Sequence, residues 1–329
     1  MLMILALHAF NTYFWDSLSN LSNQMTSQDI IVILGESFTS CAGGLFVFIP
    51  GWFGIRPKVK SVANIVFQVI FYGFIILIVT SFTTGSVSWK GVKELVLLTD
   101  SLWFIKSYFL LYILSPILNS FVENADERKL RAVIVTFFVF QSIWGWTDTA
   151  KEFNYGLSVV FFIFMYLLAR YMRLFLNKRI DSISKFVFLG IYGLSAILIA
   201  ASVFVKHYFG LIPLTEQMLL SYVRPLMVLC SVSLFLFFSK AHFKSKAINW
   251  ISTSCLSGYL IHMNSIVAPV YTNIVGAELL ERKYFLLFTI IIGVFFFCAA
   301  VDQIRQWVYK FTVGLLFDKR WHLFSIVIL

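Results

Sequence analysis

Long apolar runs separated by short charged segments constrain this chain more than any other feature of its sequence. Such runs occur at about residues 1–15, 31–55, 62–82, 102–121, 132–146, 155–176, 186–205, 221–238, 250–275 and 284–312. A helix needs about 20 apolar residues to cross the hydrocarbon core of a bilayer, and most of the runs reach or exceed that length. Because lipid offers no hydrogen-bond partner to the backbone, each run is predicted to form a transmembrane helix.

The composition excludes an ordinary soluble fold. Hydrophobic residues make up 60% of the 329 residues and charged residues 13%, whereas globular domains have about 45–50% and about 25%. A soluble domain of this length cannot bury so much apolar surface. We therefore expect one all-α domain over residues 1–329, a polytopic integral membrane protein with about ten transmembrane helices.

The net charge of +10 raises the question of a nucleic-acid partner. Lys and Arg gather in short segments between the apolar runs, near residues 56–60, 128–131, 170–185, 240–246 and 305–320. The segments that alternate with these hold few cations. This distribution is typical of loops on the cytoplasmic side of a membrane protein and not of a nucleic-acid surface. It predicts a multi-pass protein of the cell membrane with both termini in the cytoplasm.

Five ionisable residues stand out in or at the mouths of the apolar runs: His8, Glu36, Lys106, Arg224 and His262. Such groups are costly in a membrane, so each is a hypothesis about function. The predicted orientation puts all of them at middle to outer depth. One interpretation is structural, with Glu36 paired to Lys106 or Arg224. In the other, a histidine acts as a general base near neutral pH, although a buried neutral histidine with one hydrogen-bond partner is the commoner case.

Cysteine and tryptophan residues add less specific information. The four cysteines lie far apart inside apolar runs, which indicates buried side chains and no metal site. Most tryptophans lie near predicted span ends, as interfacial belts require. Trp103 and Trp146, both at the predicted outer side, are also candidates for contact with a sugar. The chain has no P-loop, HExxH or paired CxxC motif, which argues against ATP-driven transport and zinc hydrolysis.

Four segments occur in the order typical of one family. They are LMILALHAF at Leu2–Phe10, GLFVFIPGWFGI at Gly44–Ile55, LWFIKSYFLLYILSPILN at Leu102–Asn119 and INWISTSCLSGYLIHMN at Ile248–Asn264. Together they resemble the integral-membrane acyltransferase family 3, which includes O-acetyltransferases of bacterial surface polysaccharides. The third segment is the most specific. Pro50 replaces the small serine of the family pattern in the second.

The resemblance implies transfer of an acyl group from a cytoplasmic acyl-CoA, acetyl-CoA in the first place, to a hydroxyl of a surface polysaccharide or its lipid-linked precursor. His8 would be the base that deprotonates the acceptor hydroxyl, or would relay the acyl group. Glu36 would orient His8, while Lys106 and Arg224 would stabilise the developing oxyanion. His262 would support these residues.

The same resemblance suggests where the donor binds. The basic turns at Arg56, Lys58, Lys60, Arg170 and Arg173 would meet the phosphates of CoA, although the cytoplasmic excess of positive charge also explains them. No permanently bound cofactor and no metal are expected. The expected partners are acyl-CoA, a glycan or lipid-linked glycan and the bilayer, and a homo-oligomer is compatible with this class.

The first apolar run is short for a span, with about 15 residues before the polar stretch that begins at Asp16. The family pattern also places an arginine upstream of the first-span histidine, at a position that would precede Met1. Both observations favour a first helix that is truncated in this sequence.

Two other functions remain open from the sequence. A non-enzymatic polysaccharide exporter or flippase would need the same helices but no acyl-CoA. An ion-coupled transporter also fits buried Glu, Lys and His side chains, but it would be supported by interrupted helices in two repeats, and the sequence has no internal repeat.

Overall fold

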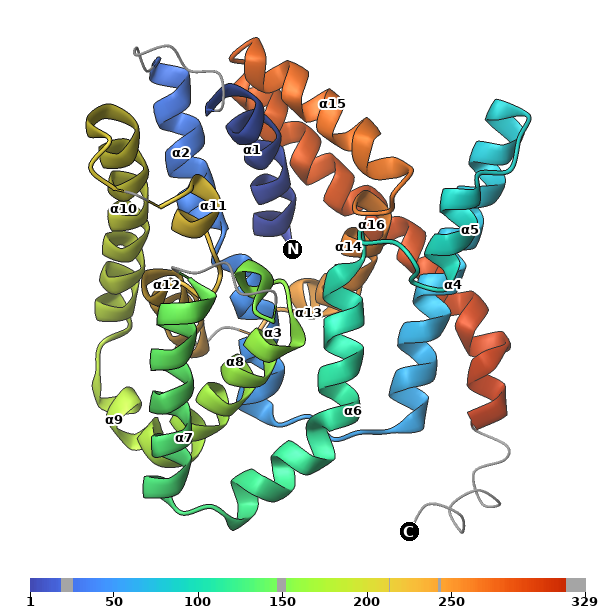
Figure 1. The fold of residues 1–329 in the computed structure, drawn as a ribbon. Coiled ribbons are helices and arrows are strands. Elements are labelled where there is room, and N and C mark those ends of the chain that lie inside the picture. The colour runs from blue at the N-terminus through green and yellow to red at the C-terminus, as the bar shows by residue number, and fades with distance from the viewer. Residues whose placement is uncertain (19–25, 147–151, 213, 242–243, 318–329) are drawn as a thin grey trace.

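The computed structural model describes residues 1–18, 26–146, 152–212, 214–241 and 244–317. All regular elements in these ranges are helical, as predicted (Figure 1). The helices are α1 Leu2–Leu18, α2 Ser27–Thr39, α3 Ala42–Phe53, α4 Val59–Thr84, α5 Trp89–Leu95, α6 Trp103–Asn124, α7 Glu127–Phe140, α8 Val159–Tyr171, α9 Asn177–Ser182, α10 Lys185–Phe209, α11 Glu216–Leu219, α12 Pro225–Ser239, α13 Lys246–Ser252, α14 Cys255–His262, α15 Val267–Leu280 and α16 Tyr284–Phe311. Short π and 3-10 turns follow α7 and α8 and precede α8.

Each predicted apolar run contains at least one helix. Six helical stretches of the described residues are long and apolar enough to cross a membrane: Ser27–Phe53, Val59–Thr84, Trp103–Asn124, Val159–Ser182, Lys185–His207 and Tyr284–Phe317. Leu2–Phe14, Pro225–Ser239 and Val267–Leu280 are shorter apolar helices. The chain is therefore a helical membrane protein, and the count of about ten crossings stays a prediction.

The basic segments lie at one end of the helix bundle. The start of α4, the turn between α6 and α7, and α9 all lie at the lower end in Figure 1. Lys240 joins them, because its Nζ donates to the carbonyls of Asp181 and Ile183. This arrangement is compatible with the predicted orientation, which itself stays a prediction. Lys151, Lys319 and Arg320 also entered that prediction, but they lie outside the described residues.

Two of the predicted runs are interrupted in the structure. Run 31–55 forms α2 and α3, which stay one helical stretch with a short turn at Ser40 and Cys41 between them. The hydroxyls of Thr39 and Ser40 bond to carbonyls of the preceding turn at 2.7 Å, a pattern that bends helices. Run 250–275 forms α13, α14 and α15. The turn after α14 is held by Glu94, whose carboxylate accepts from the Ser265 amide at 3.1 Å. Both breaks bring helix ends to mid-height in the bundle.

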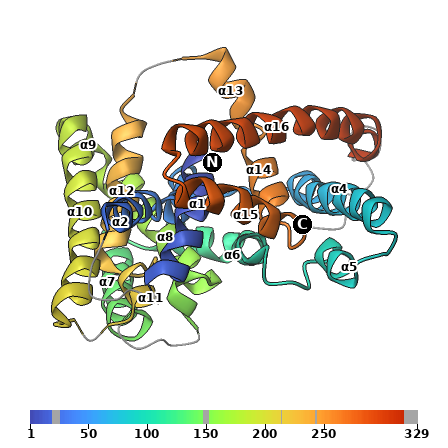
Figure 2. The ribbon, with the colours of Figure 1, turned by 90° about the horizontal axis from the view of Figure 1, so that it is seen from above.

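Helix α1 lies near the centre of the molecule when it is viewed from above (Figure 2). Leu5 and Phe14 are fully buried, and the Tyr271 hydroxyl of α15 donates to the Leu5 carbonyl at 2.8 Å. On the other side, Gly35 lets α2 approach closely, since a Cβ there would lie 2.6 Å from the Phe10 ring. These contacts hold His8, one turn after Leu5, in a defined position.

Candidate active site

A cavity of about 360 Å³ lies beside α1, between α2, α6, α14 and the segments before α8 and α12. Aromatic residues form much of its wall: Trp103, Phe104, Tyr155, Tyr222 and Tyr259. Its polar side chains include His8, Asn11, Glu36, Ser40, Gln217 and Ser221. Cavities of this kind, apolar with a few convergent polar groups, are typical sites for small ligands. We call it the active-site cavity.

Two histidines from opposite ends of the sequence meet at its wall. His8 Nδ1 lies 2.8 Å from His262 Nε2, and the ring centroids are 5.0 Å apart. His8 lines the cavity, whereas His262 is 1% exposed and lies behind it, against the ring of Tyr271. The structure thus brings together two residues that the sequence singled out separately.

The contacts of His262 determine the tautomers of both neutral rings. His262 Nδ1 bonds to the carbonyl of Gly258, one turn earlier in α14. A carbonyl only accepts, so Nδ1 of His262 carries the proton and its Nε2 is an acceptor. His8 Nδ1 must then donate to it. The remaining nitrogen of His8, Nε2, therefore keeps its lone pair on the side of the ring that faces away from His262.

Glu36 is also in the cavity wall, but it does not bond to His8. Its Oε1 accepts from Asn11 Nδ2 at 3.0 Å, and Asn11 follows His8 by almost one turn of α1. Its Oε2 has no hydrogen-bond partner in the described part of the chain. A buried polar atom without a partner is costly, about 1–3 kcal/mol, so this oxygen is suited to bind a ligand hydroxyl.

Lys106 and Arg224 have other partners, so the predicted pairing of Glu36 with either is wrong. Lys106 Nζ donates to the Thr99 carbonyl at 2.9 Å and lies 3.3 Å from the exposed carboxylate of Asp100. Arg224 donates to Ser202 and to the Leu219 carbonyl, and its guanidinium stacks on Trp146. Neither belongs to the residues that line the active-site cavity. Lys106 is held by a carbonyl and a carboxylate, and Arg224 by a hydroxyl, a carbonyl and an aromatic ring, all outside the lining of this cavity.

The basic residues proposed for CoA do not converge on one cavity. Arg56 and Lys58 are exposed, Arg170 lies against the backbone of Gly54, and Arg173 stacks on Trp52 at 5.3 Å. Lys60 differs from them, because it lines a second cavity at the start of α4. The role of these five residues in donor binding stays a prediction.

Several cavity residues come from segments that the sequence marks only as connections between spans. Tyr155 has a left-handed backbone with φ of 56°, and its carbonyl accepts from the Tyr222 amide at 3.0 Å and from the Ser221 hydroxyl at 3.1 Å. These contacts join two connections over the cavity. Asn11 was missed as well, although its spacing from His8 places both on one face of α1. Trp103 lines the cavity, whereas Trp146 packs on Arg224.

Comparison with known families identifies the family of this chain. The profile of acyltransferase family 3 (Acyl_transf_3, acyltransferase domain) matches residues 1–305. The chain belongs to acyltransferase family 3. Comparisons with curated proteins and with solved structures return no match.

In this membrane acyltransferase the histidine pair lies at the wall of a cavity that several aromatic side chains line. In the part of the chain that the structure describes, no group of three or more His, Cys, Asp or Glu side chains converges as metal ligands do.

Proposed function

We propose that this acyltransferase moves an acyl group, acetyl in the first place, from a cytoplasmic acyl-CoA to a hydroxyl of a cell-surface polysaccharide or its lipid-linked precursor. The observation that carries the proposal is the histidine pair, which leaves a lone pair on His8 Nε2 at the wall of the active-site cavity. An imidazole in this state is a general base suited to neutral pH.

The reaction needs one proton to be taken up and returned. His8 Nε2 accepts the proton of the acceptor hydroxyl, and the oxygen of that hydroxyl forms a bond to the carbonyl carbon of the thioester. The carbon–sulfur bond then breaks, and the thiolate of CoA takes the proton from His8. The products are the O-acyl ester and CoA with a free thiol, and His8 returns to its starting tautomer.

His262 acts through His8 and does not need to touch a substrate. Its Nε2 accepts from His8 Nδ1 before the proton transfer and continues to do so when His8 becomes an imidazolium ion. It therefore holds the reactive nitrogen in place and stabilises the charged intermediate, as the buried partner of a catalytic histidine does in other acyl-transfer sites.

The remaining wall suits a carbohydrate hydroxyl. Trp103 and Tyr222 both line the cavity, with ring centroids 6.3 Å apart and ring planes 29° from parallel, and aromatic rings suit contact with the apolar side of a sugar ring. Glu36 Oε2 and the amide of Gln217 add hydrogen-bonding groups. The Tyr222 hydroxyl is a donor that could meet the developing oxyanion.

The test replaces His8 by Ala and by Gln in a strain whose surface polysaccharide is analysed for acetyl content. We expect acetylation to fall by about 10²–10⁴-fold in both variants, since neither side chain accepts a proton near neutral pH. Export of polymer and the amount of membrane-inserted protein should be unchanged. Normal acetylation by well-expressed His8→Ala would exclude this mechanism, and loss of export with acetylation intact would favour the exporter.

A further inference from the structure

A second cavity, of about 490 Å³, is lined by Thr253 just before the start of α14, whereas His262 is at the end of that helix. We call it the basal cavity. It is lined by Lys60, Ser61, Asn64, Gln68, Thr253, Arg305, Gln306 and Tyr309. Every one of these side chains carries a hydrogen-bonding group. A cavity lined in this way between apolar helices is not explained by packing, because each polar group must be satisfied there.

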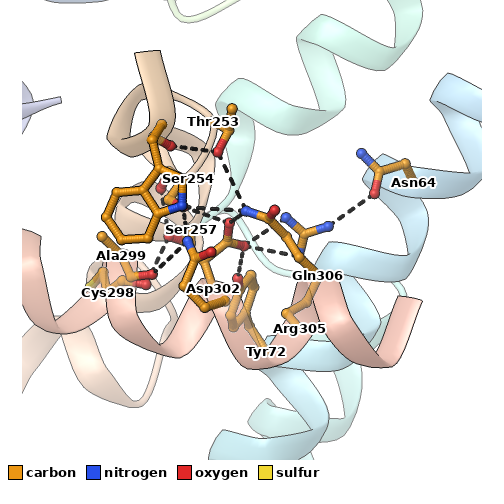
Figure 3. A network of polar contacts seen from close by, with 12 residues as sticks. Asn64, Tyr72, Thr253, Ser254, Ser257, Cys298, Ala299, Asp302, Arg305 and Gln306 are labelled. Carbon is orange, nitrogen blue, oxygen red and sulfur yellow. Dashed lines mark hydrogen bonds and ion pairs between the residues drawn. The ribbon is translucent and has the colours of Figure 1, made fainter. Parts of the chain in front are cut away.

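Arg305, one of the lining residues, forms a buried ion pair with Asp302, which does not line the cavity (Figure 3). Asp302 is fully buried. One of its carboxylate oxygens accepts a hydrogen bond from Arg305 Nε at 2.9 Å, lies 2.7 Å from Arg305 Nη2, and also accepts from the Tyr72 hydroxyl. The other oxygen accepts from Ser254 at 2.8 Å and from Gln306 at 2.7 Å. With both oxygens occupied, Asp302 fixes the guanidinium of Arg305 and adds no free acceptor to the cavity.

The charged side chains that line the basal cavity are cationic. Among the described residues they are Lys60 and Arg305, and no acidic side chain of that part of the chain belongs to the lining. Arg305 Nη1 donates to Asn64 Oδ1 at 3.1 Å, which orients the amide of Asn64 so that its N–H groups remain as donors. Two cations with surrounding N–H and O–H donors are the groups that bind phosphate esters.

The basal cavity is a near neighbour of the active-site cavity. Thr253 lines the basal cavity and Leu256 the active-site cavity, and the two are three positions apart around the start of α14. Three positions of chain span at most about 11 Å even when fully extended. A ligand can therefore bind with its charged end among Lys60, Asn64 and Arg305. A flexible chain attached to that end would then reach the active-site cavity.

We propose that the basal cavity binds the phosphate groups of the acyl donor, so that its thioester arm passes beside α14 towards His8. This inference rests on the proposed function and specifies where the donor is held. It assigns donor binding to Lys60, Asn64 and Arg305, and not to Arg56 and Lys58, which are not among the residues that line the basal cavity. The headgroup of an anionic phospholipid carries the same phosphate chemistry, and the experiment separates the two sources.

The test compares Lys60→Gln with Lys58→Gln in the full-length protein. Both remove one exposed lysine at the start of α4, but only Lys60 lines the cavity. Binding of acetyl-CoA and of acetyl-pantetheine, which lacks the nucleotide phosphates, is measured by calorimetry in nanodiscs of zwitterionic phosphatidylcholine. We expect Lys60→Gln and Asn64→Ala to weaken acetyl-CoA binding about tenfold each, as the loss of a hydrogen bond to a charged group does. Acetyl-pantetheine binding should not change.

Three outcomes would overturn the assignment. In the first, Lys60→Gln binds acetyl-CoA as tightly as the wild type and Lys58→Gln. In the second, acetyl-pantetheine loses as much affinity as acetyl-CoA. In the third, phosphatidylglycerol in the nanodiscs competes with acetyl-CoA for binding to the wild type but not to Lys60→Gln. In phosphatidylcholine nanodiscs, the wild type and Lys60→Gln then bind acetyl-CoA with equal affinity. That last result would assign the cavity to a lipid headgroup.

Failure of the proposed function is distinguishable from failure of this inference. His8→Ala should bind acetyl-CoA like the wild type and lose only transfer. If the wild type itself does not bind acetyl-CoA, the proposed donor is wrong. If the wild type binds and transfers while Lys60→Gln is unaffected, only the basal cavity is misassigned.

Discussion

Two buried carboxyl groups in this protein have opposite surroundings. Asp302 receives hydrogen bonds from α4, α14 and its own helix, and both of its oxygens are occupied. Glu36 receives one from Asn11, and its second oxygen has no partner among the described residues. The difference separates a network that is complete within the chain from a site that a ligand would complete. The first stabilises the fold, and the second is available for chemistry.

The largest expected effect comes from exchanging each carboxyl for its amide. Asp302→Asn should lower the free energy of unfolding by about 3–5 kcal/mol, because it leaves the Arg305 charge buried without its counter-ion. Glu36→Gln should have a much smaller effect on stability and should mainly reduce transfer. Thermal unfolding in detergent and acetyl transfer are measured on both variants. An equal loss of stability in Asp302→Asn and Glu36→Gln would contradict the proposed difference between the two carboxyl groups.

Replacing His262 tests whether a residue outside the cavity sets the state of His8. His262→Ala should reduce kcat by about 10²-fold or more, since His8 then loses the acceptor that fixes its tautomer. His262→Gln should recover part of the rate, because its side-chain oxygen can accept from His8 Nδ1. Acetyl-CoA binding should be unchanged in both. A residue with only a packing role would give equal losses with Ala and Gln.

The contact between α1 and α2 can be tested through Gly35. Gly35→Ala would place a Cβ 2.6 Å from the Phe10 ring and should cost about 1–3 kcal/mol of stability through overpacking. Gly293→Ala in α16 is the matched control, as no atom lies within 4 Å of the corresponding Cβ. It should be neutral or slightly stabilising. Similar unfolding temperatures for the two variants would show that α1 is not held in this way.

The smallest effect is expected at Lys106. Its ion pair with Asp100 is solvent-exposed, so Lys106→Gln should change stability by less than about 1 kcal/mol. Transfer activity should stay within about threefold of the wild type, because the side chain does not line the active-site cavity. A loss of transfer activity comparable to that of His8→Ala would show that Lys106 does take part in the reaction.

Much of the fold was predictable because the hydrophobic effect acts locally on membrane helices. Runs of about 20 apolar residues indicate helices whatever their neighbours are. The interruptions after α2 and α14 were not predicted, since they involve hydroxyl groups of Thr39 and Ser40 and a distant carboxylate, Glu94. Asp302 was overlooked although it lies inside run 284–312, where the cost of an ionisable group could have singled it out. Its partners, which come from α4, the start of α14 and α16, could not be predicted.

The candidate site was predictable as a set of costly residues, but not as an arrangement. His8, Glu36 and His262 were singled out because each is expensive in an apolar run. The same argument selected Lys106 and Arg224, which the structure places elsewhere. Charge and depth along a helix do not determine which way a side chain points.

The sequence by itself determined that this chain is a helical membrane protein and which buried groups need an explanation, since transfer free energies are properties of single segments. Only the tertiary structure decided that His8 meets His262 across 254 positions of sequence, and that Gly258 sets the tautomer of both rings. Hydrogen bonds require partners within about 3 Å and in a defined direction. That relation exists only once the helices are packed.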